Sequence, residues 1–243
     1  MTRAFSARAT LLTSAYAGTA IPVAEYALSQ ILFCLKRGWH YALAIKREGC
    51  YVPKDYVPGA YGSTVGIISL GMTGRRVVEL LRPFDLKVIA YDPYVTPQEA
   101  ADLNVELCSL DDIFQRSDVV SLHTPWLKET EGMITGAHLA LMKPHATFIN
   151  TARGAIVREA EMIDVLKQRS DIQAVLDVTH PEPPESGSLL YTLPNVVLTP
   201  HIAGSMGEEC RRMGQFMIAE LKRYLAGVPL QWAISQEKEA ILA

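Results

Sequence analysis

The sequence predicts an α/β fold in which a doubly wound parallel sheet is flanked by helices. Short apolar runs rich in β-branched residues alternate along the chain with stretches of helical period. A glycine-containing turn joins the first of these strands to its helix, and polar clusters follow several strand ends. The chain has 243 residues, 49% of them hydrophobic and 20% charged, which is ordinary for a globular protein with one large core or two small ones.

The first predicted unit of the sheet runs from Thr64 to Asp92. Val65–Ile68 is an apolar run that suits a buried parallel strand. A turn with Gly71 and Gly74 leads from it into apolar residues at helical spacing, and a second short strand ends at Asp92. This order of strand, tight turn, helix, strand and acid is typical of the first βαβ unit of a Rossmann-type dinucleotide-binding domain.

Each special position of this unit has a predicted role. Gly71 lets the backbone approach a pyrophosphate, Gly74 lets the helix pack against the strand, and the helix N-terminus offers free N–H groups to the phosphates. Asp92 is expected to accept hydrogen bonds from ribose hydroxyls and to repel a 2′-phosphate, which favours NAD over NADP. Ser69 replaces the first glycine of the motif, and we expect it to make the turn with a negative φ.

Two other interpretations of the turn exist. Gly66 and Gly71 have the outer spacing of a phosphate-binding P-loop, but Met72 stands where the lysine of that motif must be, which excludes it. The turn could also join strand and helix in a doubly wound sheet that binds nothing. The motif by itself leaves dinucleotide binding and this second interpretation open.

Charge and cysteine content exclude further classes of function. The formal net charge of −3 indicates no nucleic-acid partner. The cysteines form no C-x-x-C pair, which favours reduced thiols in a cytosolic protein over disulfides or a zinc site, and no metal is expected. We expect all four in the core: Cys34, Cys50, Cys108 and Cys210.

The first residues have some features of a targeting segment. Met1–Gly18 contains two arginines and no acidic residue, but its apolar core at Leu11–Leu12 is interrupted by Thr13 and Ser14. No run approaches the roughly 18 apolar residues of a membrane span. We therefore expect a cytoplasmic protein without a membrane segment.

A long helical pattern precedes the first strand of the sheet. Apolar residues recur at helical spacing from Ile21 to Lys46, which predicts one long helix or two helices separated near Gly38. The second half carries much aromatic surface, including Trp39 and Tyr41. These side chains either pack on their own domain or form a dimer interface, and the sequence leaves both possibilities open.

The rhythm of strands and helices continues after Asp92. Ser109 and Asp112 form a predicted helix N-cap pair. The other predicted strands are 105–107, 118–122, 147–150, 173–176 and 196–199, and the other predicted helices are 135–142, 158–168 and 206–225.

Polar clusters follow four of the predicted strands, at 123–125, 150–154, 177–183 and 199–204. In open α/β sheets, ligands bind beyond the carboxyl ends of the strands, so these clusters are expected to form the site. Among them are an arginine, a glutamate and a histidine, which together can bind an anion and hold a proton near neutral pH.

Seven motifs in these regions occur in order from about Ala9 to Pro229: VAEYAL, VGIISLGMTGRR, YDPY, SLHTPWLKETEGMI, FINTARGAIV, LDVTHPEPP and NVVLTPHIAG. In them the chain resembles the D-isomer-specific 2-hydroxyacid dehydrogenases, the family that includes phosphoglycerate dehydrogenase and glyoxylate/hydroxypyruvate reductase. The resemblance implies an oxidoreductase that uses NAD and transfers a hydride between nicotinamide and a small 2-hydroxy or 2-oxo acid.

The resemblance also implies roles for individual residues. Arg153 grips the substrate carboxylate and keto oxygen and stabilises the developing alkoxide. His201 exchanges the proton with the substrate, and Glu182 pairs with His201 and favours its imidazolium form. Asp177 resembles the residue that meets the nicotinamide carboxamide. The implied cofactor-binding residues are Ser69, Gly71, Met72, Thr73, Gly74, Asp92, His123, Thr124, Pro125, Thr151, Ala152, Asp177 and Gly204.

The sequence departs from the family pattern in two ways. Ser69, Thr19 and Thr73 stand where the family usually has glycine, asparagine and a larger apolar residue. Family members also begin with a flavodoxin-like substrate domain, to which Met1–Thr13 would contribute only the final piece. We expect residues 1–18 to be a remnant of that domain, 19–205 the NAD-binding domain, and 206–243 a helix and tail that would pack on the substrate domain.

These departures leave two alternatives to a working enzyme. Helices next to the missing domain would expose apolar surface and favour a homodimer, so the chain could be a non-catalytic NAD(H)-binding scaffold or sensor. It could also be a truncated paralogue. The sequence leaves these possibilities open beside the dehydrogenase.

Overall fold

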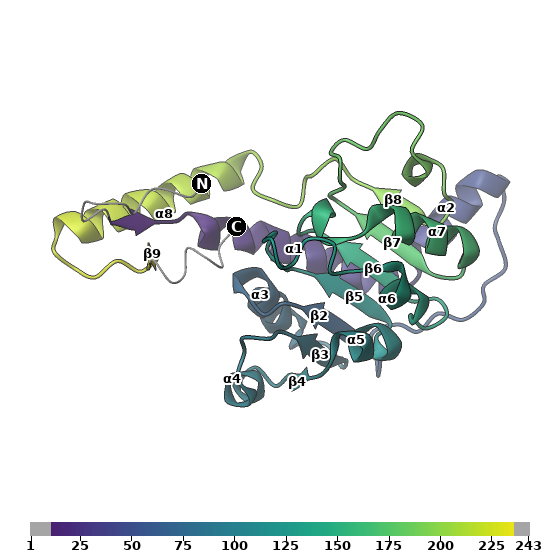
Figure 1. Ribbon diagram of the computed structural model, residues 1–243, viewed down its shortest axis with the longest axis horizontal. Helices are drawn as coiled ribbons and strands as arrows, with labels where there is room; N and C mark the ends of the chain where they lie inside the picture. The colour runs from purple at the N-terminus through teal and green to yellow at the C-terminus, as the bar shows by residue number, and fades with distance from the viewer. Residues whose placement is uncertain (1–10, 236–243) are drawn as a thin grey trace.

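The computed structural model describes residues 11–235, and its centre is a seven-stranded, all-parallel sheet (Figure 1). The strand order is β4-β3-β2-β5-β6-β7-β8, so the direction of winding reverses between β2 and β5. This confirms the predicted doubly wound fold. The strands are β2 (Thr64–Ile68), β3 (Lys87–Tyr91), β4 (Glu106–Leu107), β5 (Val119–Leu122), β6 (Thr147–Asn150), β7 (Gln173–Leu176) and β8 (Val196–Leu198).

Both faces of the sheet are covered, which explains why its central strands are apolar at successive positions rather than at alternate ones. Neighbouring residues of β2 point to opposite sides, Ile67 into one apolar cluster and Ile68 into the other. The same alternation places Phe148 and Ile149 of β6 in different clusters.

A different set of helices covers each face of the sheet. The first face is covered by α1 (Tyr16–Leu35) and α3 (Met72–Leu81), which also contact each other. The second is packed by α5 (Leu110–Arg116), α6 (Gly136–Ala140) and α7 (Glu159–Gln168). The predicted N-cap pair of α5 is confirmed, because Ser109 and Asp112 form a reciprocal capping box.

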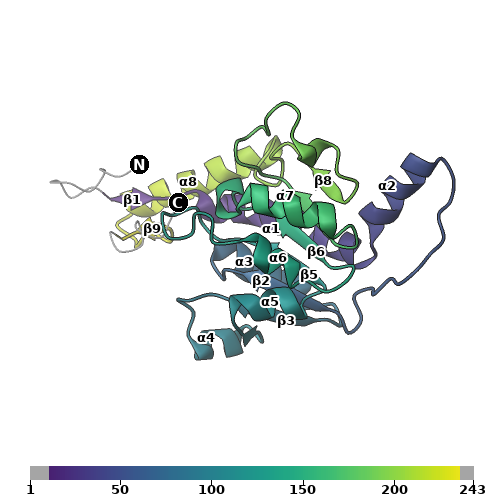
Figure 2. The ribbon, with the colours of Figure 1, turned by 45° about the vertical axis from the view of Figure 1, so that its right-hand side comes forward.

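The long helical pattern before the first strand forms two helices, α1 and α2 (Gly38–Glu48). Arg37 between them has a left-handed φ of 51°, which ends the first helix. A Cβ at Gly38 would lie 2.4 Å from the Phe33 ring, so glycine leaves room for this ring beside the bend. Within α2, Ala44 is the buried residue, and the helix extends away from the sheet (Figure 2).

Helix α1 corrects the expectation that no segment approaches a membrane span. By length and composition Tyr16–Leu35 could cross a bilayer, since its most apolar 18-residue window has a mean hydropathy of 1.3. Half of that window is buried inside the protein, where Ala24, Ala27 and Ile31 pack in the core beside α3. Core helices of folded domains pass the same test, so hydropathy does not distinguish the two cases here.

Helix α4 (Pro97–Asp102) and the short strands β1 (Leu12–Thr13) and β9 (Ala233–Ile234) were not anticipated, nor were the 3-10 helices Gly154–Ile156 and Leu189–Tyr191. Helix α4 starts at Thr96, and the Thr96–Glu99 capping box with Pro97 at the first helical position is the signal that could have predicted it. The strands β1 and β9 pair with each other across almost the whole length of the chain. A pairing of such distant segments has no local sequence signal.

The last helix, α8 (Glu208–Leu225), runs beside the start of α1 and projects from the sheet (Figure 1). Glu220 is its one buried residue. Residues 1–10 and 236–243, which include much of the predicted substrate-domain remnant and of the predicted tail, lie outside the described residues. The division of the chain into domains stays a prediction.

The cysteines differ in burial, and the expectation that all are core residues is wrong for two of them. Cys34 is buried in α1, and burial raises the pKa of its thiol to about 12. Cys108 is half-buried. Cys50 and Cys210 are exposed because they lie just after α2 and in the first turn of α8, which the core does not cover.

Candidate active site

A cleft of about 290 Å³ opens at the carboxyl edge of the sheet. It lies between the N-terminal half of α1, the start of α3 and the loops after β5 and β6, where the winding of the sheet reverses. This is where an open α/β sheet is expected to bind a ligand. The residues that line the cleft are Tyr16, Thr19, Ala20, Val23, Thr73, His123, Thr124, Pro125, Trp126, Thr151, Ala152 and Arg153.

The turn after β2 corrects one expectation. Ser69 has a φ of +77°, not a negative φ, so it adopts the left-handed conformation that the glycine of the motif would have. Its N–H donates to the Tyr91 carbonyl at 2.8 Å, which fixes the turn to β3. A Cβ at Gly74 would lie 2.0 Å from the Ser69 carbonyl oxygen, so the close approach of helix and turn requires glycine at position 74.

Asp92 ties this turn to the end of β3. One carboxylate oxygen accepts from the Leu70 N–H at 2.7 Å, and the other accepts from the Tyr94 N–H at 2.8 Å. The side chain is half-buried, and these two backbone donors hold it beside the glycine turn. Contact with a ribose stays a prediction, but the carboxylate stands at the strand end where that contact requires it.

The cleft has polar groups that lack a protein partner. The hydroxyl oxygens of Thr124 and Thr151 are buried and form no hydrogen bond among the described residues. Space beside Gly71 is open, and the N-terminus of α3 has no side-chain cap, so its N–H groups face this space. These groups fit a bound dinucleotide. The free N–H groups can donate to a phosphate, and the buried hydroxyls can form hydrogen bonds with a ribose or a carboxamide.

His123 lines the cleft as a neutral residue. It is 7% exposed, and burial lowers the pKa of its imidazole to about 4. One ring nitrogen, Nε2, lies 3.0 Å from the Ser121 hydroxyl. The protein therefore presents an uncharged ring here at neutral pH.

His123 should make the folded state sensitive to acid. Below pH 6.5 the histidine of the unfolded chain binds a proton, whereas in the folded chain it binds one only near pH 4. The free energy of unfolding therefore decreases as the pH falls from about 6.5 to about 4. From pH 7 to pH 4.5 the free energy of unfolding of the wild type should fall by about 2 kcal/mol more than that of the His123→Asn variant. Urea unfolding of both proteins across this range measures it. If the free energy of unfolding fell equally with pH in both proteins, His123 would not be the group responsible.

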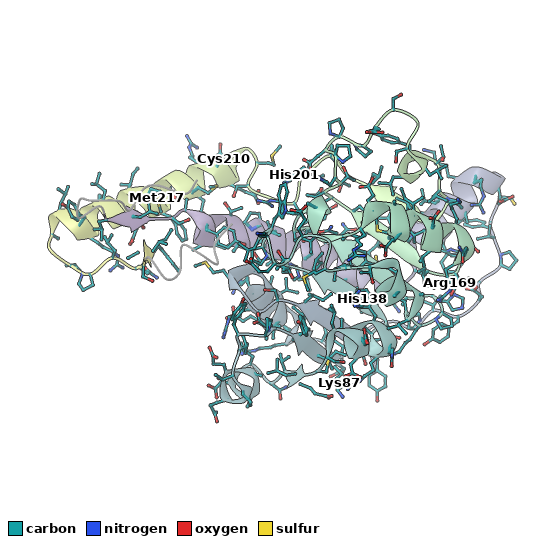
Figure 3. All side chains as sticks on the ribbon, in the orientation of Figure 1. Lys87, His138, Arg169, His201, Cys210 and Met217 are labelled. Carbon is teal, nitrogen blue, oxygen red and sulfur yellow. The ribbon has the colours of Figure 1, made fainter. Side chains whose placement is uncertain are left out.

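Glu182 and His201, predicted to pair, do so. His201 Nδ1 lies 2.6 Å from Glu182 Oε1, and each side chain is somewhat less than half exposed. His201 Nε2 has no hydrogen-bond partner among residues 11–235, so it remains available to a ligand. The histidine lies between the sheet and the start of α8 (Figure 3). A carboxylate hydrogen-bonded at Nδ1 fixes the orientation of the ring and leaves Nε2 free for a ligand.

Asp177 holds the turn that carries His201. The carboxylate is 2% exposed and accepts from the Thr199 hydroxyl at 2.6 Å and from the N–H groups of Ile202 and Ala203 at 2.9 and 2.8 Å. These hydrogen bonds support a left-handed φ of 55° at His201, a conformation that is uncommon for residues other than glycine. The sequence had indicated only a contact with the cofactor for Asp177, which stays a prediction.

Arg153 lies in the cleft at the end of β6. The Asn150 side chain shapes its turn by donating to the Arg153 carbonyl and accepting from the Ala152 N–H, each at 3.0 Å. The guanidinium is exposed and donates to the Ala152 carbonyl at 2.6 Å. Arg153 lines the cleft, whereas Glu182 and His201 lie outside its wall.

Gly154 brings these two parts of the site together. A Cβ at Gly154 would lie 2.0 Å from the carbonyl carbon of Thr179 and 2.2 Å from its oxygen. The arginine turn therefore packs directly on the backbone that leads, a few residues later, to Glu182. The side chain of Glu159 supports the same backbone by accepting from the His180 N–H at 3.0 Å.

Replacing Gly154 with alanine should separate the two parts of the site. The added methyl meets backbone, which cannot rotate away, so we expect a loss of about 1–3 kcal/mol or more in the free energy of unfolding. Urea unfolding measures the loss. Gly214→Ala is the matched control, because Gly214 is a helical glycine of α8 with nothing within 4 Å of an added Cβ. Equal stability of the two variants would contradict the tight contact.

Several lining residues were not found from the sequence. Tyr16 and Trp126 are exposed aromatic residues in the cleft wall, and Trp126 packs edge-on against His180 at 5.6 Å. Its indole N–H donates to Glu131 at 3.2 Å. The position of Trp126 directly after His123-Thr124-Pro125 was the available signal.

The predicted residue Gly204 lies near the cleft, because a Cβ at this glycine would be 3.9 Å from the methyl group of Thr19, which lines the cleft.

No group of three or more histidine, cysteine or acidic side chains is arranged to hold a metal ion in the part of the chain that the structure describes. The described residues bring together a histidine paired with a carboxylate, an exposed arginine and a cleft at the carboxyl edge of the sheet.

Comparison with known proteins gives a consistent result. Residues 29–203 match the family described as "D-isomer specific 2-hydroxyacid dehydrogenase, NAD binding domain". The D-3-phosphoglycerate dehydrogenase of Archaeoglobus fulgidus is 32% identical over 229 residues, which are 94% of this chain and 43% of that protein. The enzyme of the same name from Mycobacterium tuberculosis is 37% identical over 92% of this chain and 42% of its own length.

A solved structure is similar over most of the fold. The NAD-complexed D-isomer specific 2-hydroxyacid dehydrogenase from Lactobacillus delbrueckii ssp. bulgaricus has 27% identity and a TM-score of 0.79, with 93% of this chain and 72% of that chain covered. The chain spans less than half the length of the two curated relatives.

Proposed function

Because this chain belongs to the D-isomer specific 2-hydroxyacid dehydrogenase family and contains its NAD-binding domain, we propose that it transfers a hydride between nicotinamide and a small 2-hydroxy or 2-oxo acid. The observation that carries the proposal is the Glu182–His201 pair at 2.6 Å, coupled through Gly154 to the turn of Arg153. These are the groups that such a reaction needs for its proton and for its anionic substrate.

Each of the three side chains has a distinct role in the proposed reaction. NADH, when bound, supplies the hydride. Arg153 binds the substrate carboxylate and stabilises negative charge that develops on the keto oxygen. His201 donates the proton from Nε2 to that oxygen, and Glu182 stabilises the charged ring before the transfer. In the oxidation direction His201 accepts the proton.

The cleft residues would hold the cofactor. The N–H groups of Met72, Thr73 and Gly74 at the start of α3 would face the pyrophosphate, with Gly71 allowing its approach. Asp92 would accept from a ribose hydroxyl, and the unpartnered hydroxyls of Thr124 and Thr151 would bond to the nicotinamide half.

The direct test is NADH consumption. NADH absorbance at acid to neutral pH with glyoxylate, hydroxypyruvate and other 2-oxo acids measures turnover, and calorimetry measures NADH binding. We expect both binding and turnover. Binding without turnover in folded protein would instead favour an NAD(H)-binding scaffold or sensor, and absence of binding would remove both functions. The homodimer and the cytoplasmic location stay predictions, which sedimentation and fractionation test.

A further inference from the structure

A chain of hydroxyl groups connects α1 to the turn that carries His201. The Tyr26 hydroxyl lies 2.8 Å from the Thr199 hydroxyl, and the Thr199 hydroxyl donates to Asp177 Oδ1 at 2.6 Å. Asp177 in turn accepts from the N–H groups of Ile202 and Ala203, the two residues after His201. Tyr26 is thus joined to the histidine turn by successive hydrogen bonds.

The direction of this chain follows from counting hydrogen atoms. Thr199 has one hydroxyl proton, and it points to the carboxylate of Asp177, which when ionised has no proton to return. The Tyr26 hydroxyl must therefore donate to Thr199. Burial raises the pKa of Tyr26, so its phenol keeps this proton at neutral pH. All donors of the chain point toward Asp177, an arrangement in which each bond polarises the next.

The turn at the end of the chain needs support. His201 has a φ of 55°, a conformation that L side chains rarely adopt, and its exposed ring gains little from packing. Its backbone N–H is held by the carbonyls of Asp177 and Thr199, both at 3.0 Å. The two N–H groups that follow depend on the Asp177 carboxylate, which Thr199 holds in position and which Tyr26 reaches through Thr199.

We propose that Tyr26 is a positioning residue for His201, acting through Thr199 and Asp177. The proposal rests on the proposed function, since these hydrogen bonds can position a proton donor only if His201 is that donor. It also gives α1 two tasks. Thr19, Ala20 and Val23 of this helix line the cleft, so one rigid helix aligns the cleft wall with the histidine turn.

Amide hydrogen exchange tests the chain without requiring turnover. Tyr26→Phe removes one hydroxyl and keeps the ring, so the fold should persist. We expect the Ile202 and Ala203 amides to exchange about 5-fold faster in this variant, the size of one lost hydrogen bond. The Asp177 amide, which donates to the Asn150 carbonyl, should be unchanged and serves as the internal reference.

Two further variants separate the hydroxyl chain from packing. Thr199→Val interrupts the chain and should accelerate exchange at least as much as Tyr26→Phe, whereas Thr199→Ser keeps the hydroxyl and should restore slow exchange. Tyr61→Phe is the control for a tyrosine hydroxyl elsewhere, because Tyr61 is 86% exposed. It should leave both exchange rates and activity as in the wild type.

Kinetics test the link to His201. In Tyr26→Phe we expect kcat to fall about 5-fold, more than the KM for NADH changes, because the chain ends at two amides of the turn that carries His201. Unchanged exchange at Ile202 and Ala203 would overturn the chain itself. Faster exchange with unchanged kcat would overturn the positioning role. If the wild type binds no NADH or shows no turnover, the proposed function fails, while the exchange data still decide the chain.

Discussion

Replacing His201 with asparagine should lower kcat by about 10²–10⁴-fold, the usual contribution of a positioned general acid. Asparagine tolerates a left-handed φ better than most residues, so the turn at φ 55° should keep its shape when the imidazole is lost. NADH binding measured by calorimetry should be unchanged, because His201 lies outside the wall of the cleft. The loss should appear in single-turnover NADH oxidation at saturating substrate.

The matched control for this variant is Glu182→Gln. Glutamine keeps a hydrogen-bond acceptor for His201 Nδ1 but removes the charge that stabilises the imidazolium. Its loss of kcat should be smaller than that of His201→Asn, because the imidazole itself is kept. A kcat for His201→Asn equal to that of the wild type would exclude the imidazole as the proton donor.

Replacing Arg153 with glutamine should lower kcat/KM for the 2-oxo acid by about 10²–10³-fold, as expected when a donor that stabilises the developing oxyanion is removed. Because the guanidinium also binds the carboxylate of the substrate, the loss should include a higher KM. The free energy of unfolding should change little, since the guanidinium is exposed and the hydrogen bond to the Ala152 carbonyl is the one that it donates within residues 11–235.

Two controls accompany the arginine variant. Arg153→Lys keeps the charge but loses the planar fork, so it should recover only part of the activity. Arg158→Gln removes a nearby arginine that binds the Gly132 carbonyl and Glu161 at the surface, and it should retain full activity. Equal kinetics of Arg153→Gln and Arg158→Gln would show that Arg153 does not bind the substrate.

The sequence predicted the sheet well because local patterns control it. Buried strands such as Thr147–Asn150 and Gln173–Leu176 are apolar runs bounded by polar clusters, and they form where expected. The Glu182–His201 pair was available through the family motifs. The φ of Ser69 was not, because the turn conformation is imposed by the packing of Gly74 on its carbonyl, and this packing overrides the preference of serine for negative φ.

The sequence by itself determined the strands, the glycine turn, the order of the polar clusters and the family to which they point, since each depends on residues close together in the chain. Only the tertiary structure decided how the clusters meet. Gly154 touches Thr179, Asp177 clamps the turn of His201, and Tyr26 reaches that clamp through Thr199 from a distant helix. These contacts join segments far apart in sequence, so their geometry exists only once the sheet and α1 have packed.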